Sequence, residues 1–367
     1  MAVNQFAGRR TRALIHTHAL RANCQQLQGL APQSKVLATI KADAYGHGAV
    51  TVATSLSGCA AQFGVAFIDE AMQLREAGIS APMVLLDGCF SQAELQACAS
   101  EQFIPVIHHA QQLQDVLAVS LSQPLSVWVK LDSGMHRLGF NEADFGQALT
   151  ALSNSRNIKS IVAMTHLADA DRPDSHYTHT QIATFNRIMS AFPHIARSIA
   201  NSAGVLNWPE THLDWLRSGL LLYGVSTNPE LPAPLALRPA MTLLAPVMAI
   251  RELPVGAKVG YGCRWQAQRP TRVATLAIGY GDGYPRHAKD GTPVWLAGMR
   301  VPLIGRVSMD MITVDITDVE QQVKIGDEAE LWGANLSVHE VAKHCDTISY
   351  ELLTRVSPRV PREEVDD

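Results

Sequence analysis

The chain contains 367 residues, with 30 Lys and Arg against 34 Asp and Glu, so its formal net charge is −4. A mildly acidic chain without a block of basic residues lacks the electrostatic footprint of proteins that bind nucleic acid or anionic membranes. No apolar run approaches the ~18 residues of a membrane span, and the N-terminal MAVNQFAGRRTRAL lacks the apolar segment of a signal peptide. We therefore expect a soluble cytoplasmic protein, long enough for two domains because single cores rarely exceed about 250–300 residues.

The cysteines are scattered along the chain, with no C-x-x-C pair and no regular spacing. They stand at positions 24, 59, 89, 98, 263 and 345. In a cytoplasmic protein this pattern predicts reduced thiols that behave as small hydrophobic side chains. It favours neither a disulfide framework nor a zinc site, and we predict no metal ion.

Short, continuously apolar runs alternate with helical patterns in the first part of the chain. The predicted strands are Lys35–Lys41, Phe63–Ile68, Met83–Asp87, Phe103–His108, Ser126–Asp132, Ile161–His166, Ser198–Asn201 and Gly219–Tyr223. Continuous apolar runs are typical of parallel strands that are buried on both faces. Eight such runs with helices between them predict a (β/α)8 barrel, and a doubly wound open sheet is the alternative.

Three local signals mark the ends of helices between these strands. Ser91-Gln-Ala-Glu94 is a capping box, and Asn141 can cap the helix that follows it. Gly78 ends the helix that begins near Asp69. These signals place helices in the gaps between strands, as the barrel requires.

The sequence changes character between Asn228 and Pro239, where prolines stand at 229, 232, 234 and 239. So many prolines exclude a helix interior or a central strand, and we predict a linker. The later strand-like runs are Met241–Ile250, Thr271–Ile278, Pro293–Leu296, Val301–Val307, Ile312–Ile316 and Ala329–Trp332. We therefore predict a barrel over residues 1–232 and a mostly-β domain over 233–367, which the first residues of the chain can join.

Polar residues at the ends of the predicted strands are the candidates for an active site, because catalytic groups of such barrels come from the C-terminal strand ends. The candidates are Lys41, Lys130, Asp132, Arg137, His166, Asn201, Ser202, Arg217 and Tyr223. Taken singly, each also has a structural explanation, such as a lysine reaching solvent, a core histidine or a helix cap. Their joint placement on one face favours a site.

Lys41 and the residues after it carry a further signal. Desolvation of a lysine at the end of a buried strand favours Schiff-base chemistry. Gly46 and Gly48 permit close backbone approach to a ligand, but Thr51 stands where the dinucleotide fingerprint has its third glycine. Binding of NAD is therefore an alternative that the missing glycine disfavours.

Other segments offer binding groups and also have structural explanations. Asn201-Ser202-Ala-Gly204 stands where barrels bind phosphate, or caps a helix. Arg137 can hold a carboxylate with two hydrogen bonds, or pair with a surface acid. In the predicted β domain, tyrosines stand among glycines in Gly260-Tyr-Gly262 and Gly279-Tyr-Gly-Asp-Gly283, where they contact a ligand or fill strand kinks.

Taken together, the motifs resemble those of the alanine racemase family over about residues 10–360. They are Val36-Leu-Ala-Thr-Ile-Lys-Ala-Asp-Ala-Tyr-Gly-His-Gly48, Lys130-Leu-Asp-Ser-Gly-Met-His-Arg-Leu-Gly139, Arg217-Ser-Gly-Leu-Leu-Leu-Tyr-Gly224, Val259-Gly-Tyr-Gly262, Gly279-Tyr-Gly-Asp-Gly283 and Gly305-Arg-Val-Ser-Met-Asp310. The family usually has Asn where this chain has Asp43. The resemblance implies a pyridoxal-phosphate (PLP) enzyme that interconverts L-alanine and D-alanine. It also implies a homodimer in which the β domain of the partner completes each active site.

The resemblance implies that Lys41 binds PLP covalently and that Lys41 and Tyr261 are the two catalytic bases, one on each face of the substrate. A free phenol titrates near 10, so a chain from Tyr261 through His166 to Arg217 would assist the tyrosine. Arg217 would also meet the pyridine nitrogen. Because arginine keeps its proton, that nitrogen would stay unprotonated.

The other site residues are implied in the same way. PLP would contact Tyr45, His166, Asn201, Ser202, Arg217, Tyr350 and the backbone of Gly219 and Leu220. The substrate would contact Arg137, Met309 and Asp310, with Lys130 at a position that is carbamylated in many family members. Asp171, Tyr280, Arg286 and Arg306 would line the entry corridor.

Such an enzyme would supply D-alanine for peptidoglycan or serve alanine catabolism. One alternative is a PLP decarboxylase of the same plan, but those enzymes generally pair an acidic residue with the pyridine nitrogen, and Arg217 argues against it. A second is a non-catalytic PLP-binding barrel, which would not need Tyr261. A broad-specificity racemase is a closer relative, and such proteins often carry an export signal.

Overall fold

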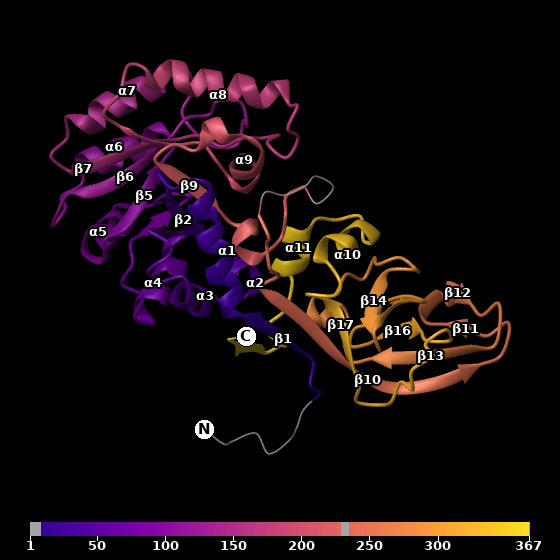
Figure 1. Ribbon diagram of the computed structural model, residues 1–367. Helices are drawn as coiled ribbons and strands as arrows, with labels where there is room; N and C mark the ends of the chain where they lie inside the picture. The colour runs from indigo at the N-terminus through magenta and orange to yellow at the C-terminus, as the bar shows by residue number, and fades with distance from the viewer. Residues whose placement is uncertain (1–8, 229–234, 367) are drawn as a thin grey trace. The chain divides into compact units, whose positions relative to one another are not determined.

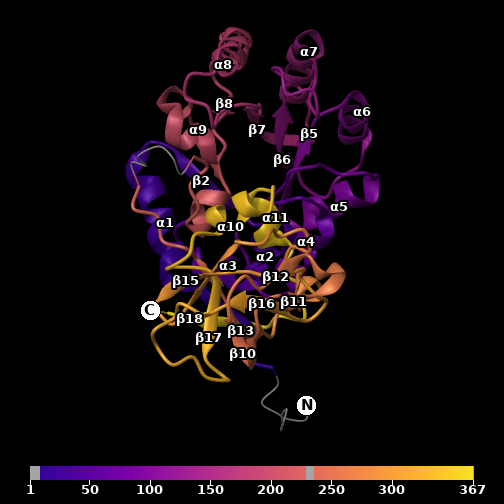
Figure 2. The same cartoon turned by 90° about the vertical axis from the view of Figure 1, so that its right-hand side faces the viewer.

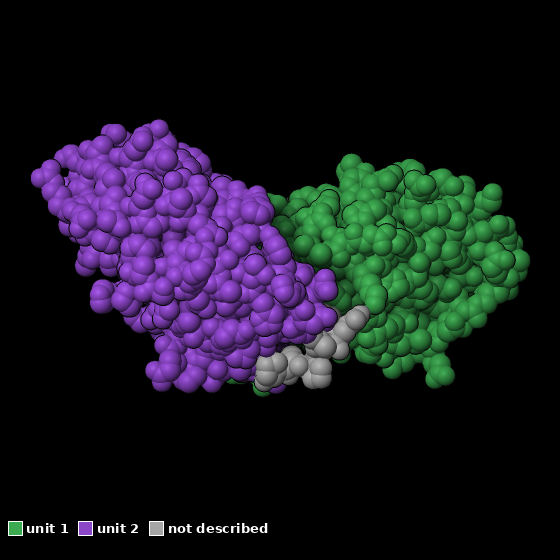
Figure 3. Space-filling view, turned by 90° about the horizontal axis from the view of Figure 1, so that it is seen from above, with its two compact units in different colours: residues 1–19, 45–48, 238–367 green, residues 20–44, 49–237 purple. Residues whose placement is uncertain are grey.

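The chain divides into two units, which Figure 3 shows in different colours. The computed structural model describes residues 9–228 and 235–366. Unit 1 comprises residues 1–19, 45–48 and 238–367, and unit 2 comprises residues 20–44 and 49–237. The domain boundary predicted at 232/233, and the linker prolines at 229, 232 and 234, lie outside the described residues.

Unit 2 is built on eight parallel strands that pair in the order β8-β7-β6-β5-β4-β3-β2-β9 (Figure 1). They are β2 (Lys35–Thr39), β3 (Gln62–Val65), β4 (Met83–Leu85), β5 (Phe103–Ile107), β6 (Leu125–Lys130), β7 (Ile158–Met164), β8 (Ala196–Ser198) and β9 (Trp215–Ser218). Across the gap between β8 and β9, the Ser198 hydroxyl donates to the Trp215 carbonyl oxygen at 2.9 Å. The predicted (β/α)8 barrel is confirmed as a nearly closed barrel, and the open sheet is excluded.

Helices cover the outside of these strands (Figure 1 and Figure 2). They are α1 (Thr17–Leu30), which begins in unit 1, α3 (Ala49–Ser55), α4 (Ile68–Glu76), α5 (Gln92–Glu101), α6 (Ala110–Ala118), α7 (Glu142–Ser153), α8 (His176–Met189), α9 (Ser202–Asn207) and the short turn η1 (Pro209–Thr211). The predicted caps are confirmed, since Ser91 accepts from the Glu94 N–H at 3.2 Å and Asn141 from the Asp144 N–H at 2.9 Å. Gly78 follows α4 with a φ of 88°.

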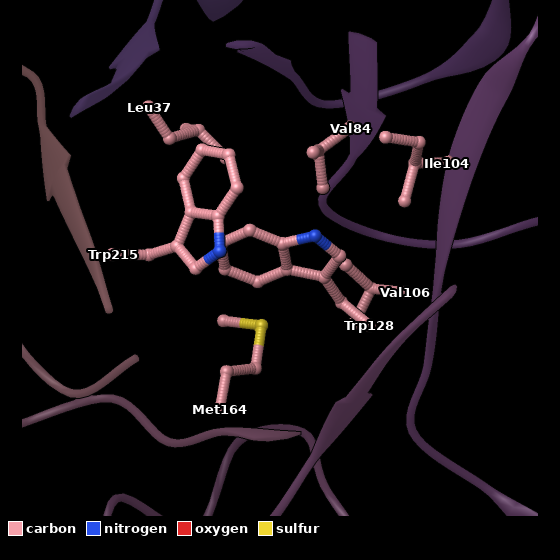
Figure 4. Close-up of a cluster of buried hydrophobic side chains, with 7 residues drawn as sticks. All are labelled: Leu37, Val84, Ile104, Val106, Trp128, Met164 and Trp215. Carbon is pink, nitrogen blue, oxygen red and sulfur yellow. The ribbon is translucent and has the colours of Figure 1, made fainter. Parts of the chain in front are cut away.

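The barrel interior is filled by apolar side chains from six of its strands (Figure 4). The cluster consists of Leu37, Val84, Ile104, Val106, Trp128, Met164 and Trp215. The rings of Trp128 and Trp215 pack with their centroids 5.6 Å apart. Because side chains occupy this interior, a ligand of the barrel must bind at a strand end.

The eighth barrel strand is not the one that the sequence predicted. Residues Leu220–Tyr223 form a short 3-10 turn, η2, and the strand is β9, which lies just before it. The apolar run was misassigned because it is buried as a helical turn, and apolar content alone does not separate the two states. Arg217, which the prediction placed just before the eighth strand, therefore lies within it.

Unit 1 is mostly β structure. Its strands are β1 (Arg12–His16), β10 (Met241–Leu253), β11 (Lys258–Val259), β12 (Trp265–Gln266), β13 (Thr271–Leu276), β14 (Pro293–Leu296), β15 (Met299–Pro302), β16 (Ile312–Asp315), β17 (Glu328–Trp332) and β18 (Arg362–Val365). The long strand β10 pairs with β1, β13 and β17, and β1 also pairs in parallel with β18. Chain segments from both ends of the sequence therefore share one sheet.

Two parts of unit 1 differ from the prediction. The run predicted as a strand over Val301–Val307 ends as β15 at Pro302, and the residues after it form a loop. The helices α10 (Val338–His344) and α11 (Ser349–Thr354) were not predicted. Both helices span no more than about two turns. So few residues show little amphipathic periodicity, and the sequence therefore does not reveal them.

The prediction that all cysteines are reduced is wrong for one pair, because Cys24 and Cys59 form a disulfide. Cys24 lies in α1 and Cys59 in the loop after α3, which Gln28 of α1 holds through a 2.7 Å hydrogen bond to the Cys59 carbonyl oxygen. This packing brings together two cysteines that stand 35 residues apart in the sequence.

None of the described helices combines the length and apolar composition that crossing a bilayer requires.

Candidate active site

The predicted polar residues of unit 2 lie at the C-terminal ends of the barrel strands. Lys130 ends β6 and Arg217 lies in β9. Lys41 and His166 each stand two residues beyond a strand, after β2 and β7 respectively. The charges of Arg217, Arg137 and Lys41 lower the pKa values of both Lys130 and His166, whereas the charge of Asp87 raises that of Lys130. The strand ends thus bring together a cationic cluster around one histidine.

Arg217 is fixed by three acceptors from two neighbouring chain segments. Its guanidinium donates to the Ser198 hydroxyl and the Thr165 carbonyl oxygen at 2.6 Å, and to the Ile199 carbonyl oxygen at 3.1 Å. The residue is 5% exposed, and burial lowers the pKa of Arg217 to about 10. Because no carboxylate is recorded among these acceptors, the guanidinium keeps its positive charge available to the site.

The contact with Arg217 determines the protonation of His166. The Arg217 guanidinium faces His166 Nδ1 at 3.5 Å. An arginine has only donors, so this contact favours Nδ1 as the accepting nitrogen, and a neutral imidazole then carries its proton on Nε2. Burial lowers the pKa of His166 well below the usual histidine value, and the charges of Arg217 and Lys130 lower it further. His166 is therefore a neutral hydrogen-bond donor through Nε2.

Lys130 is a buried lysine in a positive environment. It is 6% exposed, and its pKa falls to about 8 because of burial and then of the charges of Arg217 and Arg137. Among the residues that the structure describes, no ion pair or hydrogen bond of its amine is recorded. A neutral amine at this position is a nucleophile near neutral pH.

Arg137 follows a loop that Asp132 organises. The Asp132 carboxylate accepts from the N–H groups of Gly134 and His136 at 3.0 and 2.9 Å. The candidate Asp132 thus shapes the turn after β6, and Arg137, which is exposed, extends from that turn. The candidate Tyr223 also has a structural role, because its buried hydroxyl donates to the Thr39 carbonyl oxygen at 2.9 Å.

Backbone groups gather where β8 and β9 end. Asn201 caps α9, accepting from the Gly204 N–H at 2.9 Å, and Ser202 accepts from the Gly219 N–H at 3.0 Å. Ser202 and Leu220 are buried. The helix-cap explanation of Asn201 is thus confirmed, and Ser202, Gly219 and Leu220 lie beside one another.

Lys41 begins α2 (Lys41–Gly46), a turn of unusual hand. The φ values of Ala42, Asp43, Ala44 and Tyr45 are 52°, 52°, 52° and 55°. The left-handed region costs L-residues roughly 1–2 kcal/mol each. A run of four such residues persists only where surrounding contacts hold it.

Two carboxylates of unit 2 contact this turn. Asp43 accepts from the Ala49 N–H at 2.7 Å, at the start of α3. Glu70 of α4 accepts from the Ala42 N–H at 2.7 Å and from the Ala66 N–H at 2.6 Å. No sequence signal indicated Glu70, because an acidic residue in the first turn of a helix is common and nothing local points to a partner 28 positions away.

In unit 1 the predicted residues lie on glycine-rich loops. Tyr261 begins the turn η3 (Tyr261–Cys263) and is 69% exposed, and Met309 is 53% exposed. The turn η4 (Tyr280–Asp282) pairs with the Met309 loop, since the Tyr280 N–H donates to the Ser308 carbonyl oxygen at 3.0 Å and the Gly281 N–H to that of Met309 at 2.8 Å. These loops present aromatic and thioether side chains to solvent.

Of the remaining predicted residues, some contact another side chain and the others are exposed. Asp310 pairs with Arg359 at 2.7 Å, and Tyr45 packs on Tyr350 with ring centroids 5.8 Å apart. Burial, with a smaller effect of Tyr350, raises the pKa of Tyr45. The corridor candidates Asp171, Arg286 and Arg306 are exposed, and Tyr280 is at the border of exposure.

Two families of known domains match consecutive parts of the chain. Residues 15–227 match "Alanine racemase, N-terminal domain", and residues 240–364 match "Alanine racemase, C-terminal domain". An alanine racemase of Shewanella baltica (strain OS185) is 47% identical over 351 residues, which cover 95% of this chain and 97% of the relative.

Solved structures agree with these matches. The biosynthetic alanine racemase from Pseudomonas aeruginosa has a TM-score of 0.92 at 43% identity and covers 97% of this chain and 99% of its own. The alanine racemase from Bartonella henselae, solved with covalently bound pyridoxal phosphate, has a TM-score of 0.88 at 29% identity, with 97% and 99% covered. The likeness extends over both units.

Proposed function

This chain belongs to the alanine racemase family, and we propose that it interconverts L-alanine and D-alanine with PLP as its cofactor. One observation carries the proposal: the primary amine of Lys41 and the guanidinium cations of Arg137 and Arg217 stand near enough to one another for their charges to lower the pKa values of both Lys130 and His166. A lysine amine is the group that binds an aldehyde covalently. The surrounding cations suit a ligand with a phosphate and a substrate with a carboxylate.

The donors at the strand ends fit PLP. The Ser202 hydroxyl and the N–H groups of Gly219 and Leu220 would hold the phosphate, together with Tyr45 and Tyr350, while Asn201 would keep the α9 end in place. Arg217, which can only donate, would face the pyridine nitrogen and leave it unprotonated. When bound, PLP supplies an electron sink that acidifies the α-hydrogen of the substrate.

Racemisation needs a proton carrier on each face of the α-carbon. We assign Lys41 to one face and Tyr261 of the partner subunit to the other. A free phenol titrates near 10, so Tyr261 needs a donor that stabilises its phenolate. His166, whose proton resides on Nε2 because Arg217 occupies Nδ1, is that donor.

The substrate carboxylate would be held by Arg137 and by the Met309 N–H, with Asp310 beside them. We propose that Lys130 carries a carbamate that orients Arg137. The neutral amine reacts with carbon dioxide, forming a new N–C bond and releasing a proton to solvent. The resulting anion lies among cations, and the lowered pKa of Lys130, about 8, favours the neutral amine that the reaction needs.

Substrate would enter along a corridor lined by Asp171, Tyr280, Arg286 and Arg306. A passage narrowed by Tyr261 and Tyr350 favours a methyl side chain over larger ones. The exposure of Tyr261 and Met309 supports a homodimer, because aromatic and thioether side chains are the groups that interfaces cover. We propose a cytoplasmic enzyme without nucleic-acid or membrane partners, which supplies D-alanine for peptidoglycan or serves alanine catabolism.

The proposal is tested by incubating the PLP-loaded protein with L-alanine in D₂O. We expect D-alanine to appear together with α-deuteration, and both to be lost in Lys41→Ala. Loss of the carboxylate as carbon dioxide would instead identify a decarboxylase. A protein that binds PLP and leaves L-alanine unchanged would overturn the proposal.

A further inference from the structure

The strained turn after Lys41 is held by a carboxylate that uses both of its oxygens. Glu70 Oε1 accepts from the Ala42 N–H at 2.7 Å, and Oε2 accepts from the Ala66 N–H at 2.6 Å. Ala42 is the residue directly after Lys41, and its φ of 52° is unfavourable for an L-residue. One side chain thus connects the lysine turn to the end of β3 and the start of α4.

One of these two bonds is an ordinary helix cap. Glu70 is the third residue of α4 (Ile68–Glu76), and the bond to the Ala66 N–H closes the start of that helix. Glu94 occupies the same place in α5 (Gln92–Glu101) and accepts from the Phe90 N–H at 2.8 Å. Of Glu70 and Glu94, only Glu70 accepts a second hydrogen bond within the described residues, from the Ala42 N–H of the lysine turn. Capping of α4 therefore does not require the hydrogen bond from the Ala42 N–H.

We propose that Glu70 is the positioning residue for Lys41, which it serves by holding the left-handed turn that carries the catalytic amine. The inference rests on the proposed role of Lys41. A displaced amine costs rate, because proton transfer and covalent attachment depend on the geometry of the reacting atoms. Glu70 itself has no contact with the reacting atoms and acts through Ala42.

A carboxylate is required for both bonds together. Two backbone N–H groups face its two oxygens, and each donates a hydrogen bond. A glutamine has one accepting oxygen, and its NH₂ group would meet the second N–H with a donor. The isosteric Glu70→Gln is thus expected to leave the Ala42 and Ala66 N–H groups competing for one accepting oxygen, which weakens the bond to Ala42 without changing the side-chain volume. In Glu94→Gln the oxygen can keep the single bond to Phe90, which makes it the matched control.

The test compares Glu70→Gln with Glu94→Gln by three measurements. We expect Glu70→Gln to lower kcat about 30-fold, the factor that corresponds to one hydrogen bond to a charged group, with little change in KM for alanine. Exchange of the Ala42 amide, followed in protein without PLP, should accelerate by a similar factor. Glu94→Gln should change neither quantity more than about 3-fold. The fraction of PLP attached to Lys41, trapped by borohydride and read by peptide mass, should fall in Glu70→Gln alone.

A second variant tests whether the loss of kcat in Glu70→Gln depends on the backbone strain in the turn. Glycine adopts positive φ without penalty, so Ala42→Gly in the Glu70→Gln background should restore part of kcat and part of the attached PLP. This double variant also serves if Glu70→Gln alone does not fold. Equal behaviour of Glu70→Gln and Glu94→Gln in amide exchange and kcat would overturn the proposal, as would a double variant without recovery.

The experiment also separates this inference from the proposed function. Amide exchange at Ala42 is measured without cofactor or substrate. It therefore reports on the hydrogen bond between Glu70 and the Ala42 N–H (the clamp) even in a protein that does not racemise alanine. Accelerated exchange in Glu70→Gln without racemisation by the wild type would contradict the function and support the clamp. Racemisation by the wild type with unchanged exchange in Glu70→Gln would support the function and overturn the clamp.

Discussion

The two units present their functional side chains in opposite ways. In the barrel, Lys130 and Arg217 are 6% and 5% exposed, and Arg217 is held by acceptors within the same unit. In the β domain, Tyr261 and Met309 are 69% and 53% exposed, and the Met309 loop is held by backbone hydrogen bonds and by the pair of Asp310 with Arg359. The barrel thus has a preorganised half of a site. The β domain presents groups that acquire an environment only when another surface covers them.

The largest expected effect tests whether those exposed groups act in the partner subunit. Lys41→Ala and Tyr261→Phe should each lower kcat about 10³-fold or more. A purified hybrid dimer of the two variants should recover about half of the wild-type rate, because one of its sites then has both residues intact. The measurement is the racemisation rate of hybrids isolated with two affinity tags.

A second hybrid is the matched control for the first. Wild type combined with the double variant Lys41→Ala/Tyr261→Phe places one defect in each shared site, so this dimer should be inactive. Sites confined to single subunits reverse both outcomes, because the first hybrid would then be inactive and the second half active. That reversal would show that Tyr261 does not act in the site of the partner subunit.

The next effect concerns the buried cations of the barrel. The pKa of Lys130 is about 8 in the folded protein against an ordinary 10.5. Between these pH values the unfolded chain holds more protons than the native state, so the free energy of unfolding should rise with pH, by up to about 3 kcal/mol. Below pH 8 the lysine is protonated in both states and the cost of burying its charge is constant. Urea unfolding in buffer free of carbon dioxide measures the rise.

Two comparisons assign this slope to Lys130. Lys130→Met should abolish it, whereas Lys159→Met, which alters an exposed lysine of the same unit, should leave it unchanged. Addition of bicarbonate should extend the slope below pH 8, because a native carbamate holds no proton on the Lys130 nitrogen's former ammonium site while the unfolded lysine still does. A slope that survives in Lys130→Met would show that another group causes it.

The smallest expected effect concerns Asp43, where the family usually has Asn. The Asp43 carboxylate accepts one hydrogen bond, from the Ala49 N–H at 2.7 Å, and an asparagine oxygen can accept it equally. Asp43→Asn should change the free energy of unfolding by less than about 0.5 kcal/mol, and Asp43→Ala should lower it by about 1 kcal/mol. Asn141→Ala, which removes the cap of α7, gives the reference value. A large loss in Asp43→Asn would mean that the charge itself supports the turn.

Much of the fold could be predicted because the relevant signals are local. Continuous apolar runs indicated seven of the parallel strands, although the predicted Ser198–Asn201 shares only Ser198 with β8, and Ser91 and Asn141 form the predicted caps. The eighth strand was misplaced because Leu220–Tyr223 is apolar for a different reason, burial as a helical turn. The disulfide between Cys24 and Cys59 was missed because its two segments meet only through packing.

The candidate site divides in the same way. The sequence by itself determined which residues stand at the strand ends, including Lys41, Lys130 and His166, because strand order and chain order coincide in a parallel barrel. Only the tertiary structure decided that Arg217 occupies His166 Nδ1 and that Glu70 holds the turn after Lys41. Those contacts join residues 51 and 28 positions apart. A hydrogen bond between distant segments depends on where both segments are placed in space, which no local pattern of residues encodes.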